Sequence, residues 1–215
     1  MTVLENVALA PLTTLNVGGA ARYFTEPKSV TEVAEAVNFA RSRDLPLFVL
    51  GGGSNLVVSD AGWPGMVLKL AISGIDQREE NGKARFEVGA GEEWDKFVAR
   101  AVARNCAGVE WLSGITGSVG GTPVHNVGAY GQEVPQTIKS VLVCELQGGQ
   151  VRDLCAEACG FQYRTSIFNS SERGRFIILR VTYDLTPGGK PRIDYADLKK
   201  HFAGFQNAPS LAGTR

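Results

Sequence analysis

The residues best suited to chemistry gather in one glycine-rich stretch between Trp111 and Glu133. Six glycines fall between Gly114 and Gly131, among serine, threonine and asparagine residues. Because glycine has no Cβ, it adopts positive φ readily and lets another molecule approach the main chain closely. Successive backbone N–H groups in such a loop form a concavity that binds anions, phosphates above all. The stretch therefore predicts an anion-binding loop. An ordinary surface loop is the alternative.

A second, shorter glycine run, Gly51-Gly-Gly-Ser-Asn55, directly follows the apolar residues 47–50. Alone, it fits a plain turn between two strands equally well. Together, the two loops indicate a ligand with a diphosphate at its centre. Neither loop has the G-x-G-x-x-G pattern or the Gly-Lys-Ser/Thr ending of a P-loop, which excludes the two commonest nucleotide signatures and leaves nucleotide binding open.

Composition narrows the class of protein. The chain has 215 residues, enough for one large domain or two small ones. Its 22 basic and 22 acidic residues balance, so neither nucleic acid nor an anionic membrane is expected as a partner. No apolar run reaches the roughly 20 residues that span a bilayer. The first residues show no signal peptide, and we therefore expect a cytoplasmic protein.

The four cysteines are Cys106, Cys144, Cys155 and Cys159. The spacing of the last two is one helical turn and would suit half a metal site, but no second Cys/His pair accompanies them. We therefore predict buried, reduced thiols and no metal centre.

Two units must hold the loops in place. In the first, the capping box Ser29–Glu32 begins a helix with apolar residues spaced to Ala40. Residues 9–24 read as an extended segment, and strands are expected at 47–50 and 66–70, on either side of the short glycine run.

The second unit begins after about residue 72. The expected elements are a strand at 85–88, a helix from Trp94 to about Arg104, a two-residue hairpin turn at Gly148-Gly149, a short helix around Cys155, a strand at 176–185 and a helix opening at Tyr195. The predicted fold class is α+β, with two small sheet-and-helix subdomains.

Three motifs, in this order and spacing, resemble a single family: Leu50–Leu56, Gly117–Gly131, and the Tyr-Arg-Thr-Ser-Ile-Phe of 163–168. This family is UDP-N-acetylenolpyruvoylglucosamine reductase, a flavoenzyme of bacterial peptidoglycan synthesis. The resemblance implies a two-subdomain FAD-binding fold of the vanillyl-alcohol oxidase type, with subdomains at 1–71 and 72–206. It further implies FAD as cofactor, NADPH as reductant, an enolpyruvyl UDP-sugar as substrate, and a monomer for the complete enzyme.

The resemblance also assigns roles to single residues. Those matching the family's FAD-binding positions are Gly51, Gly52, Gly53, Ser54 and Asn55 in the first loop, and Ile115, Thr116, Gly121, Val124 and Gly128 in the second. Those matching substrate-binding positions are Tyr130, Tyr163, Arg164 and Tyr195. Arg164 matches the catalytic arginine, a role that suits a planar, permanently charged donor. A surface ion pair for Arg164 and a packing role for Tyr195 are the alternatives.

The chain also departs from the family. Thr116 stands where the family usually has proline, and His125 where it has glutamine. The family continues into a third, substrate-binding domain that supplies the proton-donating serine and a late glutamate, whereas residues 207–215 resemble only its beginning. We therefore expect this chain to bind FAD and to be inactive alone. The alternatives are a non-catalytic flavin-binding module and another FAD oxidoreductase of the same fold.

Overall fold

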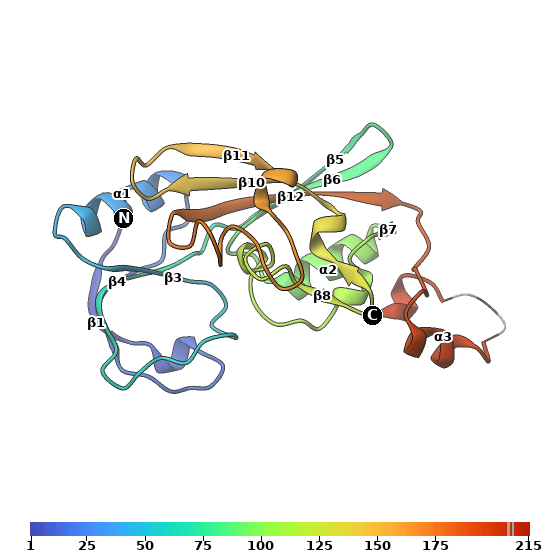
Figure 1. Ribbon diagram of the computed structural model, residues 1–215, viewed down its shortest axis with the longest axis horizontal. Helices are drawn as coiled ribbons and strands as arrows, with labels where there is room; N and C mark the ends of the chain where they lie inside the picture. The colour runs from blue at the N-terminus through green and yellow to red at the C-terminus, as the bar shows by residue number, and fades with distance from the viewer. Residues whose placement is uncertain (206, 208) are drawn as a thin grey trace.

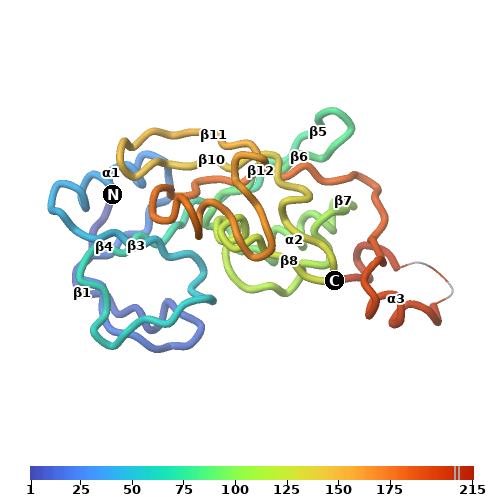
Figure 2. Tube along the Cα trace, in the orientation of Figure 1, coloured from blue at the N-terminus to red at the C-terminus, as the bar shows by residue number. Residues whose placement is uncertain are grey.

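The computed structural model describes residues 1–205, 207 and 209–215. The predicted end of the second subdomain at Gln206, and Ala208 in the predicted start of a third domain, lie outside the described residues. Two sheets organise the chain (Figure 1). In Figure 2 the first sheet and the C-terminal helix lie at opposite ends of the longest axis, with the glycine-rich stretch between them.

The first sheet is built from the N-terminal part of the chain. Its strands are β1 (Leu4–Ala8), β2 (Ala20–Thr25), β3 (Leu47–Leu50) and β4 (Trp63–Lys69), in the order β1-β2-β4-β3. β1 pairs antiparallel with β2, whereas β4 lies parallel to both β2 and β3. β4 is buried on both faces, since Met66 and Leu68 enter one core cluster and Val67 the other. This double burial explains its continuous apolar sequence.

Helix α1 (Val30–Arg41) connects β2 to β3 and begins where the capping box predicts. Ser29 accepts the Glu32 N–H through its side chain at 3.2 Å. Glu32 in turn accepts the Lys28 N–H at 2.6 Å, so the reciprocal bond reaches one residue further back than in the standard motif. The helix buries Val33, Ala36, Val37 and Ala40 against the sheet.

The second sheet is antiparallel and six-stranded. Its strands are β5 (Ile75–Glu80), β6 (Lys83–Gly89), β10 (Ile138–Glu145), β11 (Val151–Cys155) and β12 (Phe176–Pro187), in the order β11-β10-β12-β6-β5, with β7 (Cys106–Ala107) paired to the end of β12. Helix α2 (Trp94–Ala103) packs on this sheet, and its Phe97 ring lies 4.8 Å from Tyr183 and 5.7 Å from Phe86 between centroids. On β12, the fully buried Val181, Tyr183 and Leu185 alternate with more exposed residues.

The remaining elements are short. They are strands β8 (Gly128–Ala129) and β9 (Gln132–Glu133), helix α3 (Ala196–Phe202), and the 3-10 turns η1 (Ala10–Leu12), η2 (Glu110–Leu112), η3 (Val119–Gly121), η4 (Val134–Gln136), η5 (Glu157–Cys159) and η6 (Ala212–Thr214). The first sheet ends at Lys69 and the second begins at Ile75, so the predicted boundary at residue 71 falls between them. The division into subdomains remains a prediction.

Two local predictions are wrong. Cys155 ends strand β11, where it pairs with Ser140, because a hairpin with β10 offers that segment a full ladder of backbone hydrogen bonds. The helical turn comes only afterwards, at Glu157–Cys159. The hairpin itself is confirmed, but five residues separate β10 from β11, so the two-residue turn at Gly148-Gly149 is not formed.

All four cysteines are free thiols. Three are buried as predicted, and burial raises the pKa of Cys159 to about 12. Cys155 is exposed, contrary to the prediction, because it ends an edge strand. In the described part of the chain, no helix is long and apolar enough to cross a membrane, and no group of three His, Cys, Asp or Glu side chains could hold a metal ion.

The solvent face of the second sheet carries one bidentate ion pair that joins β6 to β12. Arg85 donates from Nε to Asp184 Oδ1 at 2.7 Å and from a terminal nitrogen to Oδ2 at 2.9 Å. Arg85 holds the pKa of the Asp184 carboxyl below its ordinary value. The pair therefore stabilises the fold above the unfolded-state pKa of about 3.9, and this contribution is lost as pH falls through the lower, folded-state pKa.

Replacing Asp184 with asparagine should lower the free energy of unfolding near neutral pH by roughly 1–2 kcal/mol, because a neutral amide cannot form an ion pair with Arg85 and its hydrogen bonds are weaker. The difference from wild type should disappear in acid, where the wild-type carboxyl is protonated. Urea unfolding at neutral and acid pH measures this, with Asp76→Asn on exposed β5 as control. A difference of equal size at both pH values would contradict the ion-pair explanation.

Candidate functional site

The two glycine loops meet, although more than sixty residues separate them in sequence. A Cβ on Gly52 would lie 2.8 Å from the Cα of Gly117, and one on Gly51 would lie 2.8 Å from the Ser118 hydroxyl oxygen. No side chain fits at Gly52 without moving backbone. Beside this contact is a cavity of about 420 Å³, lined by Gly51 and Gly52 on one side and by residues 114–118 on the other. The two loops therefore lie side by side, as binding of one shared ligand would require.

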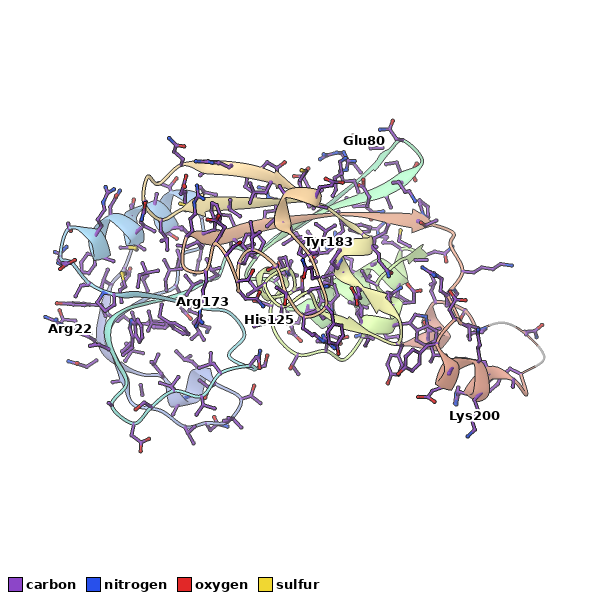
Figure 3. All side chains as sticks on the ribbon, viewed as in Figure 1. Arg22, Glu80, His125, Arg173, Tyr183 and Lys200 are labelled. Atoms are coloured by element: carbon purple, nitrogen blue, oxygen red, sulfur yellow. The ribbon has the colours of Figure 1, made fainter. Side chains whose placement is uncertain are left out.

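The first loop is held by the segment between β1 and β2. Thr14 donates its N–H to the Gly53 carbonyl at 3.0 Å. Gly53 has φ +69°, and a Cβ there would lie 2.0 Å from the Leu12 carbonyl oxygen, so only glycine fits. Asn55 adds a second link between the loops, with its Nδ2 3.4 Å from Nε2 of His125. Figure 3 shows His125 and Tyr183 near the centre of the molecule, whereas Arg22, Glu80 and Lys200 lie at its periphery.

The second loop is held by the N-terminus of α2. Trp94 donates its backbone N–H to the Gly117 carbonyl at 3.0 Å and its indole N–H to the Leu112 carbonyl at 2.8 Å. Asp95 Oδ1 accepts the Gly114 N–H at 2.8 Å, and its Oδ2 is paired with Arg215. The Gly114 N–H, with help from Arg215, holds the pKa of Asp95 below its ordinary value.

Asp95 was not predicted from the sequence, and neither were Gly91, Glu93 and Lys69, which also line the cavity. One signal was present, because an acidic residue in the first turn of a helix is suited to accept backbone N–H groups. Which N–H group Asp95 accepts depends on tertiary structure.

Charged side chains around the cavity are paired. Lys69 contacts Glu26 at 2.9 Å and Glu93 contacts Lys96 at 2.8 Å, while Asp95 is paired with Arg215. The backbone N–H groups of residues 51–55 and 115–118, in contrast, donate to no protein acceptor in the part of the chain that the structure describes. Unpaired N–H groups on two touching loops can bind an anion without any side-chain charge.

The predicted cofactor residues divide into two groups. Gly51, Gly52, Ile115 and Thr116 line the cavity, and Gly53, Ser54 and Asn55 continue the first loop beside it. The other three residues follow η3 or lie within it. A Cβ on Gly121 would have only the Ser118 hydroxyl oxygen nearby, at 4.0 Å. The Val124 carbonyl accepts the Ser166 hydroxyl at 2.8 Å, and the Gly128 carbonyl accepts the Arg164 guanidinium at 2.9 Å.

The predicted substrate residues also lie along this second part of the loop. Arg164 bonds the Gly128 carbonyl and, among the described residues, has no carboxylate partner. Tyr163 is 80% exposed beside it. Tyr130, with φ +51°, packs edge-on against Tyr195 at 5.9 Å between ring centroids. The structure thus places Arg164 beside the loop and Tyr130 against Tyr195, and their roles remain predictions.

The chain matches known proteins throughout this region. The family model described as "FAD binding domain" matches residues 21–154. The UDP-N-acetylenolpyruvoylglucosamine reductase of Thermobifida fusca is 45% identical over 91% of this chain and 55% of its own length. That of Pseudomonas fluorescens is 37% identical over 93% of this chain and 59% of its own length. The chain therefore spans somewhat more than half the length of these curated relatives.

Solved structures agree with the sequence matches. The UDP-N-acetylenolpyruvylglucosamine reductase of Thermus caldophilus is 30% identical, with a TM-score of 0.72 over 94% of this chain and 67% of that protein. A cholesterol oxidase and the 6-hydroxy-D-nicotine oxidase of Arthrobacter nicotinovorans, 14% and 18% identical, share the fold with TM-scores of 0.60 and 0.58. The predicted α+β fold of the vanillyl-alcohol oxidase type is confirmed. The chain belongs to the UDP-N-acetylenolpyruvoylglucosamine reductase family and contains its FAD-binding domain.

Proposed function

We propose that this chain binds FAD across its two glycine loops and forms the FAD-binding part of a peptidoglycan-synthesis enzyme. That enzyme uses NADPH to reduce UDP-N-acetylglucosamine enolpyruvate to UDP-N-acetylmuramate. The observation that carries the proposal is the set of unpaired backbone N–H groups on residues 51–55 and 115–118, beside a cavity of about 420 Å³. A monomeric, cytoplasmic enzyme and subdomains at 1–71 and 72–206 belong to the same proposal.

The residues present fit FAD. The unpaired N–H groups would hold its diphosphate, and the missing Cβ atoms at Gly51 and Gly52 leave the main chain open to it. Ile115, Thr116, Gly121, Val124 and Gly128 would hold the rest of the cofactor along the second loop. FAD supplies hydride transfer when bound, and the protein positions it and tunes its surroundings.

Arg164, Tyr130, Tyr163 and Tyr195 would form the substrate side. The guanidinium of Arg164 would stabilise the negative charge that develops when hydride adds to the enolpyruvyl double bond. Its present bond to Gly128 fixes it beside the second loop, where that charge would appear. The added hydride leaves carbanion character that a general acid must quench. We assign that acid to the part of the relatives that this chain does not match.

The test is made in two steps on the purified chain. Flavin fluorescence and absorbance should first show that it binds FAD, and an absence of binding would refute the proposal. The bound flavin is then photoreduced and mixed anaerobically with the enolpyruvyl UDP-sugar. We expect negligible reoxidation. Rapid and complete reoxidation would place the proton donor within residues 1–215.

A further inference from the structure

We propose that Asn126 is a positioning residue for Arg164, which it serves by tying the second glycine loop to the turn that carries the arginine. The proposal rests on the function proposed above for Arg164. The family resemblance gives Asn126 no role, and Asn126 does not line the cavity between the glycine loops.

Three alternate residues of the loop hold the turn at 162–166. The Val124 carbonyl accepts the Ser166 hydroxyl at 2.8 Å, the Asn126 amide donates to the Gln162 carbonyl at 2.6 Å, and the Gly128 carbonyl accepts the Arg164 guanidinium at 2.9 Å. The turn is therefore fixed at its start, its tip and its end by one short segment of the loop. Asn126 holds the start, immediately before Tyr163 and Arg164.

The orientation of the Asn126 amide is well determined. Its Nδ2 donates to the Gln162 carbonyl and, at 3.2 Å, to a carboxylate oxygen of Glu133. Both partners can only accept, so the nitrogen must face them. Asn126 is 3% exposed and has φ +42°, a conformation that asparagine tolerates better than most residues.

The other side of the same amide is unpaired. Asn126 Oδ1 is buried and has no hydrogen-bond partner in the described part of the chain. Leaving a buried acceptor unpaired costs about 1–3 kcal/mol. Fold stability alone therefore does not explain an asparagine at this position, whereas the two bonds donated by Nδ2 explain it as an anchor.

The turn needs such an anchor because it is strained. Gln162 and Thr165 exchange two backbone hydrogen bonds of 2.9 Å, which place Arg164 at φ +56°. A left-handed residue with a long side chain costs about 1–2 kcal/mol relative to the ordinary helical conformation. Without the Asn126 bond the turn can relax, and the guanidinium then leaves Gly128. The N–H groups at 51–55 and 115–118 donate no hydrogen bond to this turn, so the proposed diphosphate site should stay intact and the chain should still bind FAD.

The first test needs no cofactor. Asn126→Asp preserves size and tolerance of positive φ but removes both donors, and near pH 8 it faces Glu133 as a second negative charge. Hydrogen exchange of peptide 162–169 should become faster on the order of tenfold, while β10 and β12 exchange as in wild type. Asn105→Asp, the same change at another left-handed position with φ +54°, is the control and should leave this peptide unaffected.

A double variant separates the two bonds of the amide. Glu133→Gln, added to Asn126→Asp, removes the charge repulsion and restores a donor between these two side chains, but it restores nothing toward Gln162. Fast exchange should therefore persist. If exchange returned to the wild-type rate, or never increased in the single variant, the Gln162 bond would not be the anchor and the proposal would be overturned.

The second test connects the anchor to the flavin. Asn126→Gly, which is neutral and accepts positive φ, and Arg164→Gln should both lower the two-electron reduction potential of bound FAD, because each withdraws the cation. The double variant should show no further shift, since both changes act through one group. Additive shifts would mean that Asn126 acts independently of Arg164 and would overturn the proposal. Failure of wild type to bind FAD would refute the proposed function instead, and hydrogen exchange would still decide the anchor.

Discussion

Replacing Gly52 with valine is expected to abolish FAD retention. A Cβ at this position would already lie 2.8 Å from the Cα of Gly117 and 3.1 Å from its carbonyl carbon. Backbone cannot yield as the end of a flexible side chain can, so the two loops must separate. The N–H groups that would hold the diphosphate then no longer converge. Flavin absorbance per protein after gel filtration measures the loss, and far-UV circular dichroism should stay near wild type.

Gly121→Val should also remove FAD, but for a different reason. A Cβ on Gly121 would have only the Ser118 hydroxyl oxygen nearby, at 4.0 Å, so the FAD-free chain has room for it. Its thermal unfolding should therefore match wild type, and the clash should arise only with the cofactor. Gly148→Val, in the hairpin loop between β10 and β11, is the control and should retain FAD. If Gly52→Val and Gly121→Val both kept stoichiometric flavin, the diphosphate assignment would be wrong.

Arg164→Lys should have the second large effect. In a form extended to the full length of the relatives, we expect FAD to be retained and flavin reoxidation by the UDP-sugar to slow by about two orders of magnitude. Lysine keeps the charge but lacks the planar fork that can hold the Gly128 carbonyl and a substrate carboxylate together. Anaerobic stopped-flow measurement of the reduced flavin gives the rate.

Arg173→Lys is the matched control for this change. Arg173 is exposed nine residues further along the same segment, and its substitution should leave the rate unchanged. Equal rates for wild type and Arg164→Lys would remove Arg164 from the catalytic residues. Slowing in both variants would indicate that lysine disturbs the whole segment, and that the loss is not specific to Arg164.

Elements with strong local signals were predictable from the sequence. Ser29 and Glu32 mark the start of α1 because the capping bonds are made within four residues. Trp94, Phe97, Val98, Ala101 and Val102 mark α2 because they form one face, and all are buried. The positions of both glycine loops were equally clear, since glycine there meets a backbone requirement.

Strands at the edges were not predictable in this way. β5 has the sequence Ile-Asp-Gln-Arg-Glu-Glu and pairs on one side only, so its charged residues remain in solvent and no apolar alternation reveals it. The Asn81-Gly82 turn that joins it to β6 was a usable signal, because both residues have positive φ, as a tight hairpin requires.

In the site, contacts between residues far apart in the sequence could not be predicted. The pairing of Asp95 with Gly114, and of Asn126 with Gln162, depends on how loops from different parts of the chain pack together. No local pattern encodes either pairing. Residue types therefore identified the two glycine loops that we propose bind the cofactor, whereas only the fold identified the residues that hold those loops in place.

The left-handed conformations of Tyr130 and Arg164 have a consequence for how this protein responds to selection. Glycine or asparagine at either position would relieve about 1–2 kcal/mol of backbone strain, a large share of the stability of an ordinary domain. Neither side chain is buried in the core, so their loss leaves little packing to repair. A population of variants selected for heat resistance alone therefore gains at these two positions first, and it becomes more robust by discarding two residues that we propose face the substrate.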